Sequence, residues 1–174
     1  MKILHIFTVT LALIVAGSLQ AAVNPATAPH VEVVFDHPEN FRDIKDSAVP
    51  TDKGMDAILK AIRDYIVRIA DPMLPKGYGL KIVFTDIDLA GDFEPWRGAQ
   101  WDTVRIVKDI YPPAFSFSYS VTDGSGKMVK QGSENIRDLG FQFRAVMDES
   151  DPLRYEKDIL RSWLSANLRS VGKP

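Results

Sequence analysis

Three aspartates stand close together in the segment from Thr85 to Asp92, which reads Thr-Asp-Ile-Asp-Leu-Ala-Gly-Asp. If the strand expected here stays regular, Asp86 and Asp88 share the face of the apolar residues before them, with Cα atoms about 6.6 Å apart. Carboxylates at the carboxyl end of a strand and beneath helices occupy a common ligand position in open sheets. Such a pair could hold Ca²⁺ or Mg²⁺, or act as an acid/base pair.

A structural role is the alternative for the same aspartates. The strand would then end or bulge near Thr85, and Asp86 and Asp88 would accept backbone N–H bonds in the turn toward Gly91. We favour this interpretation, because acids that structure loops outnumber catalytic acids. The sequence therefore predicts no metal ion and no catalytic residue, and it leaves Asp86, Asp88 and Asp92 as candidate ligand- or partner-binding residues.

A second group of candidates lies in the connection from Ala90 to Asp102, which contains Trp96, Arg97 and Trp101. Connections in compact domains usually have about 4–6 residues, so a longer one with two tryptophans could bind a sugar or a peptide. The alternative is that the tryptophans fold back over the open end of the core. We favour that alternative, because large aromatic side chains rarely stay in water without a reason.

Most other catalytic signatures are absent from the sequence. The chain has no cysteine, and beyond the first 21 residues its only histidines are His30 and His37, which argues against a zinc site or a thiol nucleophile. The segment 124–127 lacks the upstream glycine of a phosphate-binding loop and is explained by a hairpin turn. No Gly-x-Ser-x-Gly elbow is present, and no cofactor is expected. Residues 154–157 are interpreted as an ordinary charged helix face rather than a partner surface.

Hydrophobic periodicity predicts the elements that position these candidates. Alternation predicts strands over residues 31–35, 80–88, 103–110, 114–122 and 127–132. Apolar residues at helical spacing predict a helix that begins at Asp52 and is stopped by Pro72. A second helix is expected from Asp151, which would be its N-cap, with Pro152 at the first helical position.

This order of elements predicts an α+β fold. A strand, a helix and a strand make a parallel pair, whereas the strands joined by a hairpin must be antiparallel. We expect a two-layer sandwich with a mixed, mostly antiparallel sheet of about five strands and two helices packed on one face. Residues 31–170 form the single predicted domain, and residues 22–30 a flexible lead-in.

The first 21 residues have the layout of a secretory signal peptide. A positive start at Met1-Lys2 precedes an apolar run over residues 3–16 and a stretch of small residues that ends at Ala21. The run is shorter than the roughly 20 apolar residues of a membrane span. We expect cleavage after Ala21, or after Ala22, to give a periplasmic or secreted chain with no membrane span.

Cleavage also decides the charge of the mature chain. It removes Lys2 from 21 basic residues and leaves 23 acidic ones, so 20 minus 23 gives a formal charge of −3. A nucleic-acid partner is not expected, because binding phosphate backbones needs a basic face.

Four segments together resemble one bacterial family. They are Val-Glu-Val-Val-Phe at 31–35, Thr-Asp-Ile-Asp-Leu-Ala-Gly at 85–91, Asp-Ile-Tyr-Pro-Pro at 109–113 and Asp-Pro-Leu-Arg-Tyr-Glu-Lys at 151–157. Taken together they resemble the secreted bacterial family filed as domain of unknown function 3016. The resemblance implies a periplasmic or secreted protein, and it implies no activity and no catalytic residues.

Two functions of different classes fit the sequence. The first is a non-enzymatic binding module of the bacterial envelope, which contacts an envelope protein or a cell-wall component through the aromatic connection. The second is a metal-dependent or acid/base hydrolase centred on Asp86 and Asp88. An enzyme needs those carboxylates held in a cleft, whereas a binding module needs an exposed aromatic patch.

Overall fold

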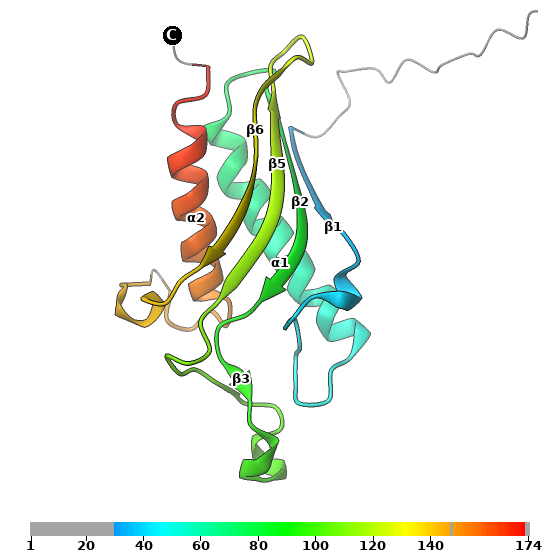
Figure 1. Cartoon of the computed structure of the whole chain (residues 1–174), viewed down its shortest axis with the longest axis vertical. Helices are drawn as coiled ribbons and strands as arrows, with labels where there is room; N and C mark the ends of the chain where they lie inside the picture. Colours follow the sequence, from blue (N-terminus) through cyan, green and yellow to red (C-terminus); the bar gives the residue numbers. More distant parts are fainter. Residues whose placement is uncertain (1–29, 147, 173–174) are drawn as a thin grey trace, which may run out of the picture.

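The chain folds into two layers, a four-stranded sheet and two helices that cover one of its faces (Figure 1). The computed structural model describes residues 30–146 and 148–172. Its main sheet contains β1 (Val31–Phe35), β2 (Gly79–Asp88), β5 (Ala114–Thr122) and β6 (Met128–Arg137), in the order β1-β2-β5-β6. The predicted α+β sandwich is confirmed, with four strands in this sheet.

The strand directions follow from the connections. β1 and β2 are parallel, because α1 (Asp52–Ala70) provides the long crossover that parallel neighbours need. β2, β5 and β6 are antiparallel to one another in turn. The tight turn between β5 and β6 is closed by a hydrogen bond from the Asp123 N–H to the Lys127 carbonyl at 2.8 Å.

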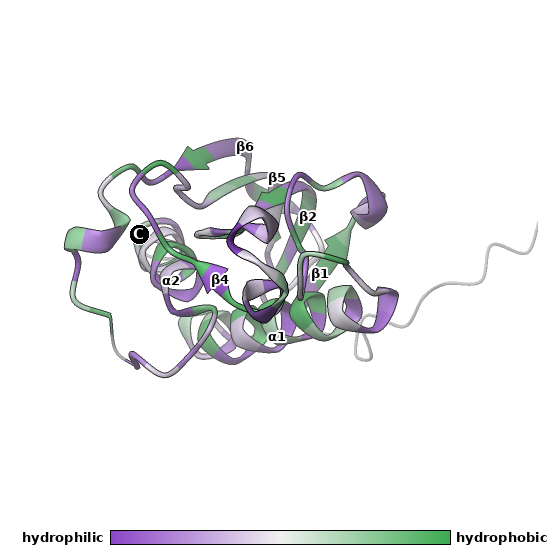
Figure 2. Ribbon diagram, turned by 90° about the horizontal axis from the view of Figure 1, so that it is seen from below, coloured by the Kyte–Doolittle hydropathy of each residue, from purple (hydrophilic) through white to green (hydrophobic). Residues whose placement is uncertain are grey.

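Both helices pack on the same side of the sheet, as the view from below shows (Figure 2). α1 begins after Thr51, whose hydroxyl accepts a hydrogen bond from the Gly54 N–H at 3.0 Å. α2 (Arg154–Leu168) buries one stripe, formed by Glu156, Ile159, Leu160, Trp163, Leu164 and Leu168. The indole ring of Trp163 meets the rings of Phe117 and Tyr119 edge-on, at centroid distances of 4.8 and 4.9 Å.

The alternation in β5 separates the core from the open face of the sheet. Phe115, Phe117, Tyr119 and Val121 are buried under the helices, as the sequence predicts. The intervening residues Ser116, Ser118 and Ser120 lie on the opposite, uncovered face.

Short elements lie in the connections between the main strands and helices. β3 (Asp92–Phe93) and β4 (Arg105–Ile106) form a separate two-stranded sheet. The remaining elements are 3₁₀ turns at Pro38–Asn40, Asp71–Met73, Pro95–Arg97, Ala99–Trp101 and Phe141–Phe143.

Three predicted boundaries need correction. A strand over 103–110 is wrong: only Arg105–Ile106 is extended, and it pairs with β3 because both edges of β2 are taken by β1 and β5. The strand after the hairpin continues to Arg137, since pairing with β5 runs on to Ala114. The last helix begins at Arg154, while the Asp151 carboxylate accepts a hydrogen bond from the Leu153 N–H in the turn before it.

The predicted signal peptide, residues 1–21, and all of the predicted lead-in except His30 lie outside the described residues. Within the part of the chain that the structure describes, no helix has the length and apolar character needed to cross a membrane.

Candidate functional site

A β-bulge at Thr85 decides where the candidate aspartates lie. The register of β2 against β5 shifts between Phe84 and Asp86, so that Thr85 has no register partner in β5, although its hydroxyl donates to the Ser116 carbonyl at 3.2 Å. Ile87 therefore occupies the core side and is fully buried, whereas Asp86 and Asp88 lie on the opposite face. The regular strand that would place both carboxylates beneath the helices is not formed, and the predicted bulge is confirmed.

The two aspartates bind a single arginine. The Asp86 carboxylate accepts a hydrogen bond from the Arg42 backbone N–H at 2.8 Å and pairs with its guanidinium at 3.1 Å. The same guanidinium lies 3.1 Å from the Asp88 carboxylate. Burial raises the pKa of Asp88, and the hydrogen bond from Arg42 opposes that shift. Asp86 is thus a backbone acceptor, as expected, but its partner follows β1 instead of lying in the turn toward Gly91. The sequence predicts that Asp88 accepts a backbone N–H as well, but it binds the Arg42 side chain instead.

Around this pair, the chain after β1 runs beside the end of β2. The Asp43 N–H donates to the Ile87 carbonyl at 3.0 Å, and the Leu89 N–H donates to the Asp43 carbonyl at 3.1 Å. Asp92 lies further along, in the wall of a small cleft of about 200 Å³ that Asp88 also lines, and its carboxylate accepts the Phe93 N–H at 2.7 Å. Among the described residues, no group of three or more histidine, cysteine and acidic side chains could hold a metal ion.

The aromatic connection forms a distal lobe, residues 91–111, that projects beyond the end of the sheet (Figure 1). A buried acid holds it together. Glu94 is only 1% exposed, and its carboxylate accepts hydrogen bonds from Arg97, Lys108 and the Tyr111 hydroxyl. The hydrogen bonds from Lys108 and Arg97 lower the pKa of Glu94 from its ordinary 4.5 to about 2. The carboxylate is therefore ionised at neutral pH.

The base of the lobe is held at two further points. The Arg105 guanidinium binds both carboxylate oxygens of Asp43, at 2.8 and 3.1 Å, and the carbonyls of Gly91 and Lys45, each at 2.8 Å. Gly91 has a φ of +79°, and a Cβ there would lie 2.7 Å from the Ile106 carbonyl oxygen. Only glycine fits this position without strain, which keeps β3 and β4 close together.

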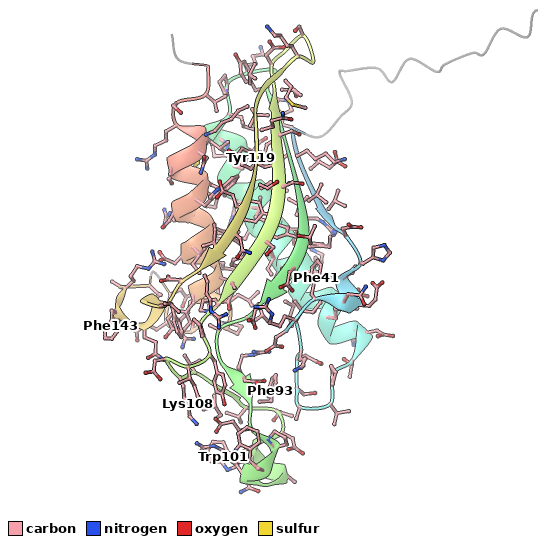
Figure 3. The ribbon with its side chains drawn as sticks, in the orientation of Figure 1. Phe41, Phe93, Trp101, Lys108, Tyr119 and Phe143 are labelled. Atoms are coloured by element: carbon pink, nitrogen blue, oxygen red, sulfur yellow. The ribbon has the colours of Figure 1, made fainter. Side chains whose placement is uncertain are left out.

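The tryptophans do not close the core. Trp96 is 73% exposed and Trp101 is 37% exposed, so the interpretation that both fold back over its open end is wrong. Phe93 is buried instead and carries the Arg105 guanidinium 4.7 Å from its ring centroid. Trp101 stands at the far end of the lobe while Phe93 lies nearer the sheet (Figure 3). The Arg97 guanidinium lies 6.0 Å from the Trp101 ring.

A second feature is a cleft of about 640 Å³ between the base of the lobe and the first turns of the two helices, here called the Glu156 cleft. Its walls include Ala57 and Ala61 of α1, Val104 beside β4, and Glu156 of α2. Glu156 is 1% exposed, and one of its oxygens accepts the Ala90 N–H at 2.6 Å.

The family model for proteins of unknown function filed as DUF3016 matches residues 29–166, most of the chain. The chain belongs to DUF3016. No curated protein and no solved structure matches it. The resemblance inferred from the four segments is thus confirmed for the family itself.

Two of those four segments meet in this DUF3016 protein, since the bond from Ala90 to Glu156 joins residues 85–91 to residues 151–157. Interpreting 154–157 as a charged surface missed Glu156. The signal was available: residue 156 lies at i+3 from Leu153 and at i−4 and i−7 from Leu160 and Trp163, on the apolar stripe of the helix.

Proposed function

We propose that this DUF3016 protein is a non-enzymatic binding module of the bacterial envelope, exported to the periplasm, which contacts cell-wall glycan through the tip of its distal lobe. The exposure of Trp96 on a lobe held by a buried acid carries the proposal. A large aromatic side chain kept in water by a well-ordered support is typical of a binding surface.

The composition of the tip favours glycan over protein. The exposed indole of Trp96 offers a flat apolar face, and the adjacent Arg97 guanidinium supplies donors that sugar hydroxyls accept. A specific protein interface uses about 20–30 residues of each partner. The two 3₁₀ turns of the tip, Pro95–Arg97 and Ala99–Trp101, have three residues each. The alternative of a hydrolase centred on Asp86 and Asp88 is less favoured, because both carboxylates are paired with Arg42.

Co-sedimentation with isolated peptidoglycan sacculi tests the proposal. The wild-type protein should pellet with the sacculi, and Trp96→Ala should weaken binding by about tenfold, the effect of losing one anchor residue. Phe143→Ala is the matched control, because Phe143 is 91% exposed but lies on the Phe141–Phe143 turn, away from the lobe (Figure 3). Both variants should keep the wild-type melting temperature.

Equal pelleting of Trp96→Ala and the wild type would refute the role of the lobe. No pelleting of the wild type, with capture of an envelope protein by the same lobe, would favour a protein partner instead.

Export is tested separately by measuring the intact mass of the protein recovered from the periplasm. The mass should correspond to a chain that begins at Ala22. A chain that retains Met1 would refute the proposed export.

A further inference from the structure

The Glu156 cleft has the size and lining of a small-molecule site. Its volume of about 640 Å³ lies within the roughly 300–1,000 Å³ typical of ligand pockets. Most of its wall is apolar, and it includes Ala57, Ile58 and Ala61 on α1 and Phe93, Val104 and Val107 on the lobe. In the view from below, β4 lies beside the two helices that form the other walls (Figure 2).

Glu156 is the polar group in this wall that the fold leaves incompletely bonded. One carboxyl oxygen accepts the Ala90 N–H, whereas the other, Oε2, is buried and has no hydrogen-bond partner among the described residues. A buried oxygen without a partner costs free energy, so a ligand that bonds to it gains an interaction that the protein alone does not make. Burial raises the pKa of the Glu156 carboxyl, which favours the protonated form, in which a carboxyl group can donate a hydrogen bond.

The charges around Glu156 indicate the ligand's head group. Arg105 and Arg154 are the cations that act on the carboxyl, and Lys45 also lines the cleft. Three cations, Lys45, Arg105 and Arg154, line the cleft against two acids, Asp46 and Glu156, so cations exceed anions among the lining residues, although Arg105 is already paired with Asp43. An ammonium head group would be repelled, whereas a carboxylate would be attracted and could accept the Glu156 O–H.

We propose that the Glu156 cleft binds a small amphiphile with a carboxylate head and an apolar chain, of the fatty-acid type. The chain lies between α1 and the lobe, and the carboxylate accepts a hydrogen bond from Glu156 near Arg154 and Lys45. This site is independent of the glycan surface at the lobe tip, so either assignment can fail without the other.

Titration calorimetry of the full mature chain with dodecanoate, kept below its micelle concentration, tests the proposal. The wild type should bind one molecule, and Ala57→Trp should lose most of the binding, because Ala57 is exposed on α1 and a large side chain there fills the cleft. Ala166→Trp is the matched control, since Ala166 is exposed near the other end of α2. It should bind as the wild type does.

Changes at Glu156 and in the probe test the head group. Glu156→Gln keeps a donor and should bind dodecanoate within about threefold of the wild type, whereas Glu156→Met should lose about tenfold, the effect of one hydrogen bond to a charged group. Dodecylammonium should bind at least tenfold more weakly than dodecanoate. The site would be refuted if the folded wild type showed no saturable binding, or if Ala57→Trp bound equally well. Tighter binding of dodecylammonium would overturn the assignment of a carboxylate head.

Discussion

Replacing Asp86 with alanine distinguishes a structural clamp from a metal or acid/base site. The clamp has two parts: the backbone N–H of Arg42 donates to the Asp86 carboxylate, and the Arg42 guanidinium pairs with it. A hydrogen bond to a charged group contributes about 1.5–3 kcal/mol when well shielded. This one lies at an accessible edge, so we expect Asp86→Ala to cost about 1–2 kcal/mol.

The matched variant is Arg42→Ala, which keeps the backbone N–H and removes only the guanidinium. That side chain is 55% exposed, and exposed ion pairs contribute at most about 1 kcal/mol. Asp86→Ala should therefore be the more destabilising change. For a domain of this size, each kcal/mol corresponds to about 2–4 °C, so its melting temperature should fall by roughly 2–8 °C.

Thermal unfolding followed by circular dichroism, with and without millimolar Ca²⁺ or Mg²⁺, provides the measurement. Neither ion should raise the melting temperature of the wild type. If one did, and Asp86→Ala abolished the increase while Arg42→Ala enlarged it, the carboxylates would be ligands with a displaceable arginine, and the clamp would be refuted. A larger fall in melting temperature for Arg42→Ala than for Asp86→Ala would show that the ion pair, and not the backbone hydrogen bond, provides most of the stabilisation.

Two further predictions concern the core and the lobe. Deleting residues 151–174 should abolish cooperative unfolding, because Leu160, Trp163 and Leu164 are buried and each contributes about 1.5–3 kcal/mol; a sharp transition at a similar temperature would make α2 an appendage. The ionised Glu94 carboxylate stabilises the folded state, because folding lowers its pKa from 4.5 to about 2. Its contribution to the free energy of unfolding is therefore complete above about pH 4.5 and is lost as the pH falls toward 2. The difference in melting temperature between the wild type and Glu94→Gln should accordingly narrow over that window, and a constant difference would contradict it.

The elements that the sequence predicts well are those encoded by local periodicity. β1 and β5 have the predicted bounds, and α1 begins at the predicted Asp52, because alternation and helical spacing depend on neighbouring residues alone. The strand predicted over 103–110 is wrong because strand length also depends on a partner distant in the sequence. The segment has strand-like composition, but the edge available to it is the short β3.

The sequence predicts a bulge near Thr85, and the spacing of the apolar residues shows where the buried positions of the strand change from even to odd numbers. Ile82 and Phe84 occupy even positions, whereas the next buried residues, Ile87 and Leu89, occupy odd ones. A regular strand would have buried the two aspartates and exposed Ile87, which costs more than leaving Thr85 without a register partner. Arg42 could not be inferred in the same way, because it lies 44 residues from Asp86 and is brought there by the pairing of β1 with β2.

Two buried acids show why residue type alone could not identify the candidate sites. Glu94 and Glu156 are each 1% exposed, yet their environments act in opposite directions. Glu94 receives hydrogen bonds from two cations and a tyrosine, so its pKa is lowered and its bonding capacity is used within the lobe. Glu156 receives one backbone hydrogen bond, so burial dominates and its pKa is raised. Its other oxygen, beside the cleft, has no partner within the part of the chain that the structure describes. Arg97 is three residues from Glu94, but Lys108 and Tyr111 are 14 and 17 residues away, and Ala90 is 66 residues from Glu156. The number of donors makes the first acid a structural support and the second a group able to bind a ligand.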